Sequence, residues 1–130
     1  MNYAAKSASY REMEVLSASP SRLLVMLFDQ LVVQLTRAKM AIEREDVTMR
    51  TTALARSRAI VSELLSTLDF EKGEQIAVEL SAIYTVMLRE LVDVGVRKDL
   101  RVLGKLVFIA GELRDGFTAA AEQMNVKRSA

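Results

Sequence analysis

Residues 16–31 read LSASPSRLLVMLFDQL, a stretch that combines a helix start with a long apolar run. Ser19 can accept a hydrogen bond from a free backbone N–H, and the fixed φ of Pro20 suits a first helical turn. Nine of the eleven residues from 23 to 33 are apolar. The stretch therefore predicts a helix over residues 20–44 that is apolar on more than one side.

The apolar residues of this predicted first helix form two stripes at about 100° per residue. The core-facing stripe consists of Leu24, Phe28, Leu31, Leu35, Ala38 and Ile42. Met26, Val33 and Met40 form an opposite, outer stripe, and Leu23 and Leu27 lie on the flank between the two. Because a bundle buries one side of a helix, the outer stripe predicts a further partner.

Three more amphipathic helices are predicted downstream. Asp46 is expected to cap the second, the third runs from after Gly73 to near Gly95, and Asp99 is expected to cap the fourth. Their predicted core stripes are Leu54, Val61, Leu64, Leu65 and Leu68, then Ile76, Leu80, Ile83, Met87, Leu91 and Val94, then Leu103, Leu106, Val107, Ala110, Leu113 and Phe117. Short connections favour an antiparallel, up-down-up-down arrangement.

The predicted fold is therefore an all-α, antiparallel four-helix bundle with a flexible N-terminal arm. Residues 1–18 lack a sustained helical period and form the arm, residues 19–125 form the bundle, and residues 126–130 form a disordered tail. The start of the chain lacks the apolar region of a signal peptide, and no apolar run is long enough to cross a membrane. We therefore expect a protein of the cytosol.

The composition excludes several functions. The chain has neither His nor Cys, which removes disulfides, zinc signatures, histidine phosphotransfer and the usual nucleophile and base pairs. Its 18 basic and 17 acidic residues give a net charge of +1, so no strong field attracts a polyanion. We expect no enzyme, no metal or other cofactor, no nucleic-acid binding and no small-molecule substrate.

The first helix could sit centrally in an imperfect bundle and pack both stripes; otherwise its outer stripe leaves three partners open. The arm could fold over it, a second copy of the chain could dimerise there, or a foreign amphipathic segment could dock into an apolar groove. The methionines favour a foreign segment, because a flexible thioether adapts to varied shapes. Phe108 is a further candidate contact, because it falls on the polar face of the predicted fourth helix.

Three stretches, in matching order and spacing, resemble the flagellar export chaperones of the FliS family. They are SYREMEVLSASPSRLLVMLFDQ at residues 9–30, STLDFEKGEQIAVELSAIYTVMLREL at residues 66–91 and VRKDLRVLGKL at residues 96–106. The resemblance implies a cytosolic chaperone that binds the disordered C-terminal segment of flagellin, prevents premature polymerisation and aids delivery to the membrane component of the flagellar type III export gate. It implies no cofactor.

The resemblance also implies roles for individual residues. Tyr10 matches the family's arm tyrosine, Leu27 matches a helix-one position, and Tyr84, at the edge of its stripe, is expected at a groove rather than in the core. The expected partner-binding residues are Tyr10, Leu23, Met26, Leu27, Val33, Met40, Tyr84 and Phe108. The alternative is a homo-oligomeric structural bundle or adaptor without a flagellin client.

Overall fold

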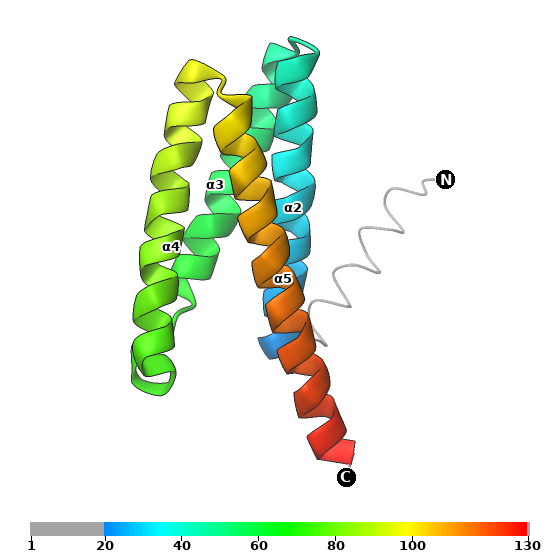
Figure 1. Cartoon of the computed structure of the whole chain (residues 1–130), viewed down its shortest axis with the longest axis vertical. Helices are drawn as coiled ribbons and strands as arrows, with labels where there is room; N and C mark the ends of the chain where they lie inside the picture. Colours follow the sequence, from blue (N-terminus) through cyan, green and yellow to red (C-terminus); the bar gives the residue numbers. More distant parts are fainter. Residues whose placement is uncertain (1–19, 130) are drawn as a thin grey trace, which may run out of the picture.

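The structure is a computed structural model that describes the backbone of residues 20–129 and side chains through residue 123. The helices of this part are α2 (Pro20–Glu43), α3 (Val47–Ser66), α4 (Phe70–Arg97) and α5 (Leu100–Ser129). Consecutive helices run antiparallel, and α5 returns to pack on α2 (Figure 1). The predicted all-α four-helix bundle is confirmed. The predicted arm lies outside the described residues, and α5 remains helical into the predicted tail.

Aspartates cap three of the helices. The carboxylate of Asp46 accepts a 3.0 Å hydrogen bond from the backbone N–H three positions on, which confirms the predicted cap of α3. Asp99 accepts from the N–H groups two and three positions on, as predicted for α5. Asp69 makes the same pair of contacts at the start of α4, so this helix begins at Phe70, three residues before Gly73, rather than after it.

A kink explains why the sequence placed the start of α4 too late. The N–H of Gly73 donates to the carbonyl of Asp69 over 2.8 Å and closes a first helical turn. The next residue, Glu74, then leaves helical geometry with φ 47° and ψ −122°. A Cβ on Gly73 would lie 2.8 Å from the Cβ of Ala77. The glycine therefore permits a close approach inside the first two turns of α4.

We expect the two residues of this kink to respond in opposite directions. Gly73→Ala should lower the free energy of unfolding by about 1–3 kcal/mol, because the new methyl overpacks against Ala77. Glu74→Gly should raise it by about 1 kcal/mol, because glycine relieves a positive φ. Urea unfolding measures both. Gly104→Ala is the control, since its Cβ would meet nothing within 4 Å, and destabilisation by this variant as well would contradict the steric explanation.

The core lies along the axis of the bundle and draws on all four helices. Its buried members are Phe28, Leu31, Leu35, Ala38, Ala53, Leu54, Val61, Leu64, Tyr84, Met87, Leu91, Val94, Leu103, Leu106 and Ala110. The ring of Phe28 stacks on that of Phe117 at 5.3 Å and tilts against that of Tyr84 at 6.4 Å. Aromatic contacts therefore join α2, α4 and α5. The predicted core stripe of the first helix is confirmed, with its end residues only partly buried.

Candidate partner-binding site

An apolar pocket lies at the end of the bundle where α2 begins, and we call it the end pocket. It has a volume of about 500 Å³. Its lining residues are Pro20, Ser21, Leu23, Leu24, Leu27, Thr67, Phe117, Ala120 and Ala121. The pocket forms here because the first turns of α2 meet the far part of α5, whose small alanines leave the space unfilled. It contains no charged side chain among these residues.

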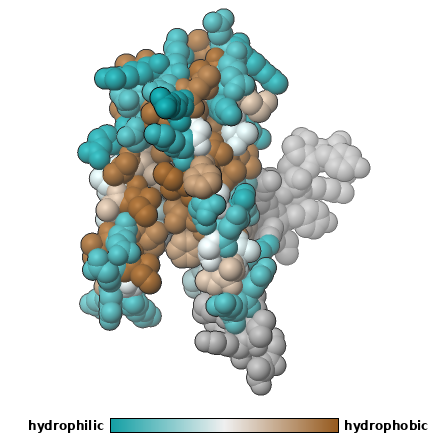
Figure 2. Space-filling model, in the orientation of Figure 1, coloured by the Kyte–Doolittle hydropathy of each residue, from teal (hydrophilic) through white to brown (hydrophobic). Residues whose placement is uncertain are grey.

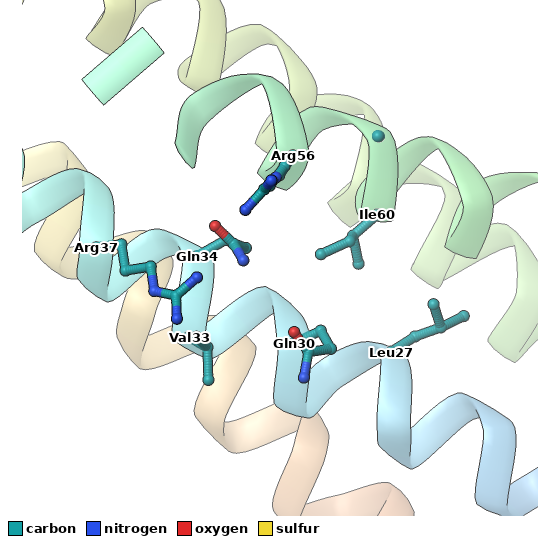
Figure 3. A pocket seen from close by; sticks show the side chains of 8 residues that line it. Leu27, Gln30, Val33, Gln34, Arg37, Arg56 and Ile60 are labelled. Atoms are coloured by element: carbon teal, nitrogen blue, oxygen red, sulfur yellow. The ribbon is translucent and has the colours of Figure 1, made fainter. Parts of the chain in front are cut away.

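A second hollow, the α2–α3 groove, follows α2 along its contact with α3 (Figure 3). It has a volume of about 650 Å³. Its lining residues are Leu27, Gln30, Val33, Gln34, Arg37, Arg56, Ala59 and Ile60. Leu27 lines both hollows, so the end pocket and the α2–α3 groove adjoin along one flank of α2.

The structure brings together three of the expected partner-binding residues. Leu23 lines the end pocket, Val33 lines the α2–α3 groove and Leu27 lines both. Met26 and Met40 are half-buried and line neither hollow. The flank of α2 that contains Leu23 and Leu27 is therefore a more continuous apolar surface than the outer stripe.

The remaining expected residues lie elsewhere. Phe108 is 67% exposed on α5 and lines neither hollow. Tyr10 lies outside the described residues. The expectation for Tyr84 is wrong, because its side chain is 1% exposed and packs in the core.

The burial of Tyr84 follows from how α4 is rotated in the bundle. The sequence pattern placed Ile76 and Ile83 in the core, but they are 66% and 36% exposed. Ile83 precedes Tyr84 by one residue, which is about 100° around the helix. The buried side of α4 is thus turned toward Tyr84 and Leu91, and the two isoleucines lie at its edge.

Burial also alters the titration of Tyr84. Desolvation raises the pKa of the Tyr84 phenol from 10.0 to about 12. The unfolded chain releases this proton first, so the stabilisation is complete below pH 10 and is lost as the pH rises toward about 12. We expect the free energy of unfolding to fall by on the order of 2–3 kcal/mol over this window.

Urea unfolding of the wild type and of Tyr84→Phe at several alkaline pH values measures this loss. Other groups titrate in both proteins, so the difference between their pH slopes isolates the Tyr84 phenol. The variant should lack the additional slope. Equal slopes in the two proteins would show that Tyr84 titrates at its ordinary pKa and is accessible to water.

The line along which α4 and α5 meet forms a seam that the sequence pattern did not reveal. The Nε of Arg114 lies 3.9 Å from the carboxylate of Asp29, which identifies the side of α5 that faces α2. Ile109 lies about 140° away on α5, and therefore on the side of α4. These two helices are the least extensively packed neighbours in the bundle. Figure 2 shows hydrophobic surface gathered in the recess between them.

No group of three or more acidic side chains in residues 20–123 is placed to hold a metal ion. No helix in the described part of the chain has both the length and the apolar character of a membrane span. The notable surface features of this part of the molecule are the end pocket, the α2–α3 groove and the α4–α5 seam.

The fold and this surface define an all-α bundle with an apolar end pocket and an adjoining groove of mixed polarity along α2. The chain belongs to the FliS family, because a family model described as "Flagellar protein FliS" matches residues 1–124. The resemblance seen in the sequence is thereby confirmed.

Individual relatives agree with the family assignment. The flagellar secretion chaperone FliS of Salmonella typhimurium is 31% identical over 119 residues, which cover 91% of this chain and 88% of the relative. That of Bacillus subtilis is 25% identical over 114 residues, covering 88% and 84%. That of Campylobacter jejuni is 43% identical over 67 residues, covering 52% of each chain. The chain is thus similar to several proteins that are named as flagellar secretion chaperones.

Proposed function

We propose that this protein is an export chaperone that binds the disordered C-terminal segment of flagellin. The proposed contact surface consists of the end pocket and the adjoining part of the α2–α3 groove. The observation that carries the proposal is that the apolar end pocket adjoins the apolar part of the α2–α3 groove at Leu27, in a member of a family of secretion chaperones. The bound segment would be held unassembled until export.

The chemistry of the surface suits such a client. An amphipathic segment that is disordered alone can fold on a rigid apolar groove, and burial of its apolar stripe offsets the cost of ordering it. Leu23 and Leu24 offer aliphatic contacts in the end pocket, and the small side chains of Ala120 and Ala121 permit close approach of a helix. Because the described part of the pocket lacks a charged lining residue, it favours the apolar side of the client.

We further propose that the complex acts in the cytosol and passes its client to the membrane component of the flagellar export gate. Such a transfer needs no nucleotide, since a client can move between partners when their affinities differ. The chaperone would release the flagellin segment when the gate binds that segment more tightly.

Inhibition of filament growth tests the proposal. Flagellin monomers are seeded to polymerise and followed by light scattering, with and without an equimolar amount of the purified chain. We expect the chain to stop elongation, and flagellin that lacks its C-terminal segment should not bind the chain. Unchanged elongation at saturating amounts of the chain would refute the proposed role.

The arm that contains Tyr10 provides a further prediction. We expect the arm to compete with the client for the apolar surface, so a chain without residues 1–14 should bind the flagellin segment several-fold more tightly. Isothermal titration of the full and shortened chains measures the difference, and Tyr10→Ala in the full chain tests the tyrosine separately. An unchanged affinity in both variants would show that the arm and the client occupy different surfaces.

A further inference from the structure

Two arginines meet in the α2–α3 groove. Arg37 comes from α2 and Arg56 from α3, and both line the groove as well as a shallower hollow that continues from it. Figure 3 shows both side chains near Gln34. Within the part of the chain that the structure describes, neither guanidinium forms an ion pair. Two positive charges thus stand in one groove without a carboxylate partner from residues 20–123.

Gln34 is a second polar group at the same place, independent of the arginines. Its residue is only 6% exposed, yet its amide forms no hydrogen bond with any residue in the described range. No fully enclosed side-chain nitrogen or oxygen in that range lacks a partner. The remaining exposure of Gln34 therefore belongs to the groove that it lines, so the amide can donate to an occupant.

The rest of the groove restricts the kind of anion. Leu27 and Ile60 give the groove an apolar part on the side away from Arg37, and Val33 adds to its lining from α2 (Figure 3). A densely charged phosphate backbone would gain nothing from this apolar part. A carboxylate with aliphatic neighbours matches both the guanidinium groups and the apolar part.

The continuation of the groove indicates an acidic residue inside a segment rather than at its end. Beyond the arginines, a hollow of about 420 Å³ extends past Thr48 and Thr52 toward the start of α3. Its one carboxylate, Asp46, already accepts the N–H of Met49 as a helix cap. A bound segment can therefore pass the arginines and continue along a polar surface.

We propose that the α2–α3 groove docks an amphipathic protein segment whose internal Asp or Glu places its carboxylate between Arg37 and Arg56. The amide of Gln34 donates to the same carboxylate, and aliphatic side chains of the segment lie on Leu27 and Ile60. This inference concerns the chemistry of the groove and does not rest on flagellin as the client.

Labelled helical peptides test the inference with the full chain. Each peptide has a stripe of leucines and one glutamate beside it. The position of the glutamate differs from peptide to peptide, so that the set samples every register. Each peptide also has an analogue with glutamine in place of the glutamate. Fluorescence anisotropy measures the affinities. The best glutamate peptide should bind about tenfold more tightly than its analogue. This preference should disappear in Arg37→Gln/Arg56→Gln and persist in Arg89→Gln/Arg101→Gln, which removes the same charge from exposed sites on α4 and α5.

The side-chain amide signal of Gln34 in nuclear magnetic resonance spectra provides a local readout. It should shift with the glutamate peptide and much less with the glutamine peptide. An equal preference in all three proteins, or no binding in any register, would overturn the inference. Displacement of the peptide by equimolar inorganic phosphate would identify a simple anion site and overturn it too. If the Gln34 signal shifts when residues 1–18 are removed but not when a peptide is added, the arm occupies the groove. This result would also overturn the inference.

A parallel titration with the flagellin segment separates this inference from the proposed function. Binding of the glutamate peptide without binding of flagellin would refute the flagellin proposal alone. Binding of flagellin without a glutamate preference in any peptide would refute the docking inference alone.

Discussion

Replacing Phe28 with alanine is expected to lower the free energy of unfolding by about 3–5 kcal/mol. The side chain is fully buried, and its ring contacts those of Phe117 at 5.3 Å and Tyr84 at 6.4 Å. Truncation would leave a cavity between three helices and remove both aromatic contacts. Because domains of this size are stable by only about 5–15 kcal/mol, much of the stability would be lost.

Denaturant unfolding followed by circular dichroism measures this loss. Phe108→Ala is the matched control, because this phenylalanine is 67% exposed on α5. Its removal should change the free energy of unfolding by less than about 0.5 kcal/mol. Similar midpoints for Phe28→Ala and the wild type would show that the aromatic centre of the bundle is not packed as described.

Replacing Leu23 with aspartate is expected to weaken binding of the flagellin segment by at least about tenfold, which corresponds to about 1.4 kcal/mol. Leu23 lines the end pocket and is not among the residues packed against the core. The variant removes an aliphatic contact and places a carboxylate where the client must exclude water. In the first turn of α2, a negative charge is compatible with the helix dipole, so the fold should be retained.

Titration calorimetry measures the affinity, and thermal unfolding verifies the fold. Val92→Asp is the control, because it introduces the same charge at an exposed apolar position of α4, away from both hollows. It should leave client binding unchanged. A fall in the unfolding midpoint of Leu23→Asp comparable to that of Phe28→Ala would assign Leu23 to the core, and an unchanged affinity would remove the end pocket from the contact surface.

Much of this fold can be predicted from local sequence signals. Asp46 and Asp99 cap their helices as expected, and the stripe that includes Phe28 and Leu31 is buried. These features depend on residues close together in the chain. The start of α4 was predicted too late because Gly73 resembles a break, whereas it permits a close approach within a kinked helix.

The site could be predicted only in part. Periodicity identified α2 as apolar beyond its core side, and Leu23, Leu27 and Val33 do line its hollows. It could not reveal how α4 is rotated, and this rotation buries Tyr84 and exposes Ile83. It also could not pair arginines from two helices, because the α2–α3 groove exists only once the helices have packed. Such features depend on tertiary geometry, which a single-helix pattern does not contain.

The most direct test of the central claim is isothermal titration of the full chain with the C-terminal segment of flagellin from the same organism, accompanied by circular dichroism of the mixture. We expect a saturable isotherm and more helix in the mixture than in the separate components, because the segment folds as it binds. No heat and no gain in helix at high concentration would contradict the claim.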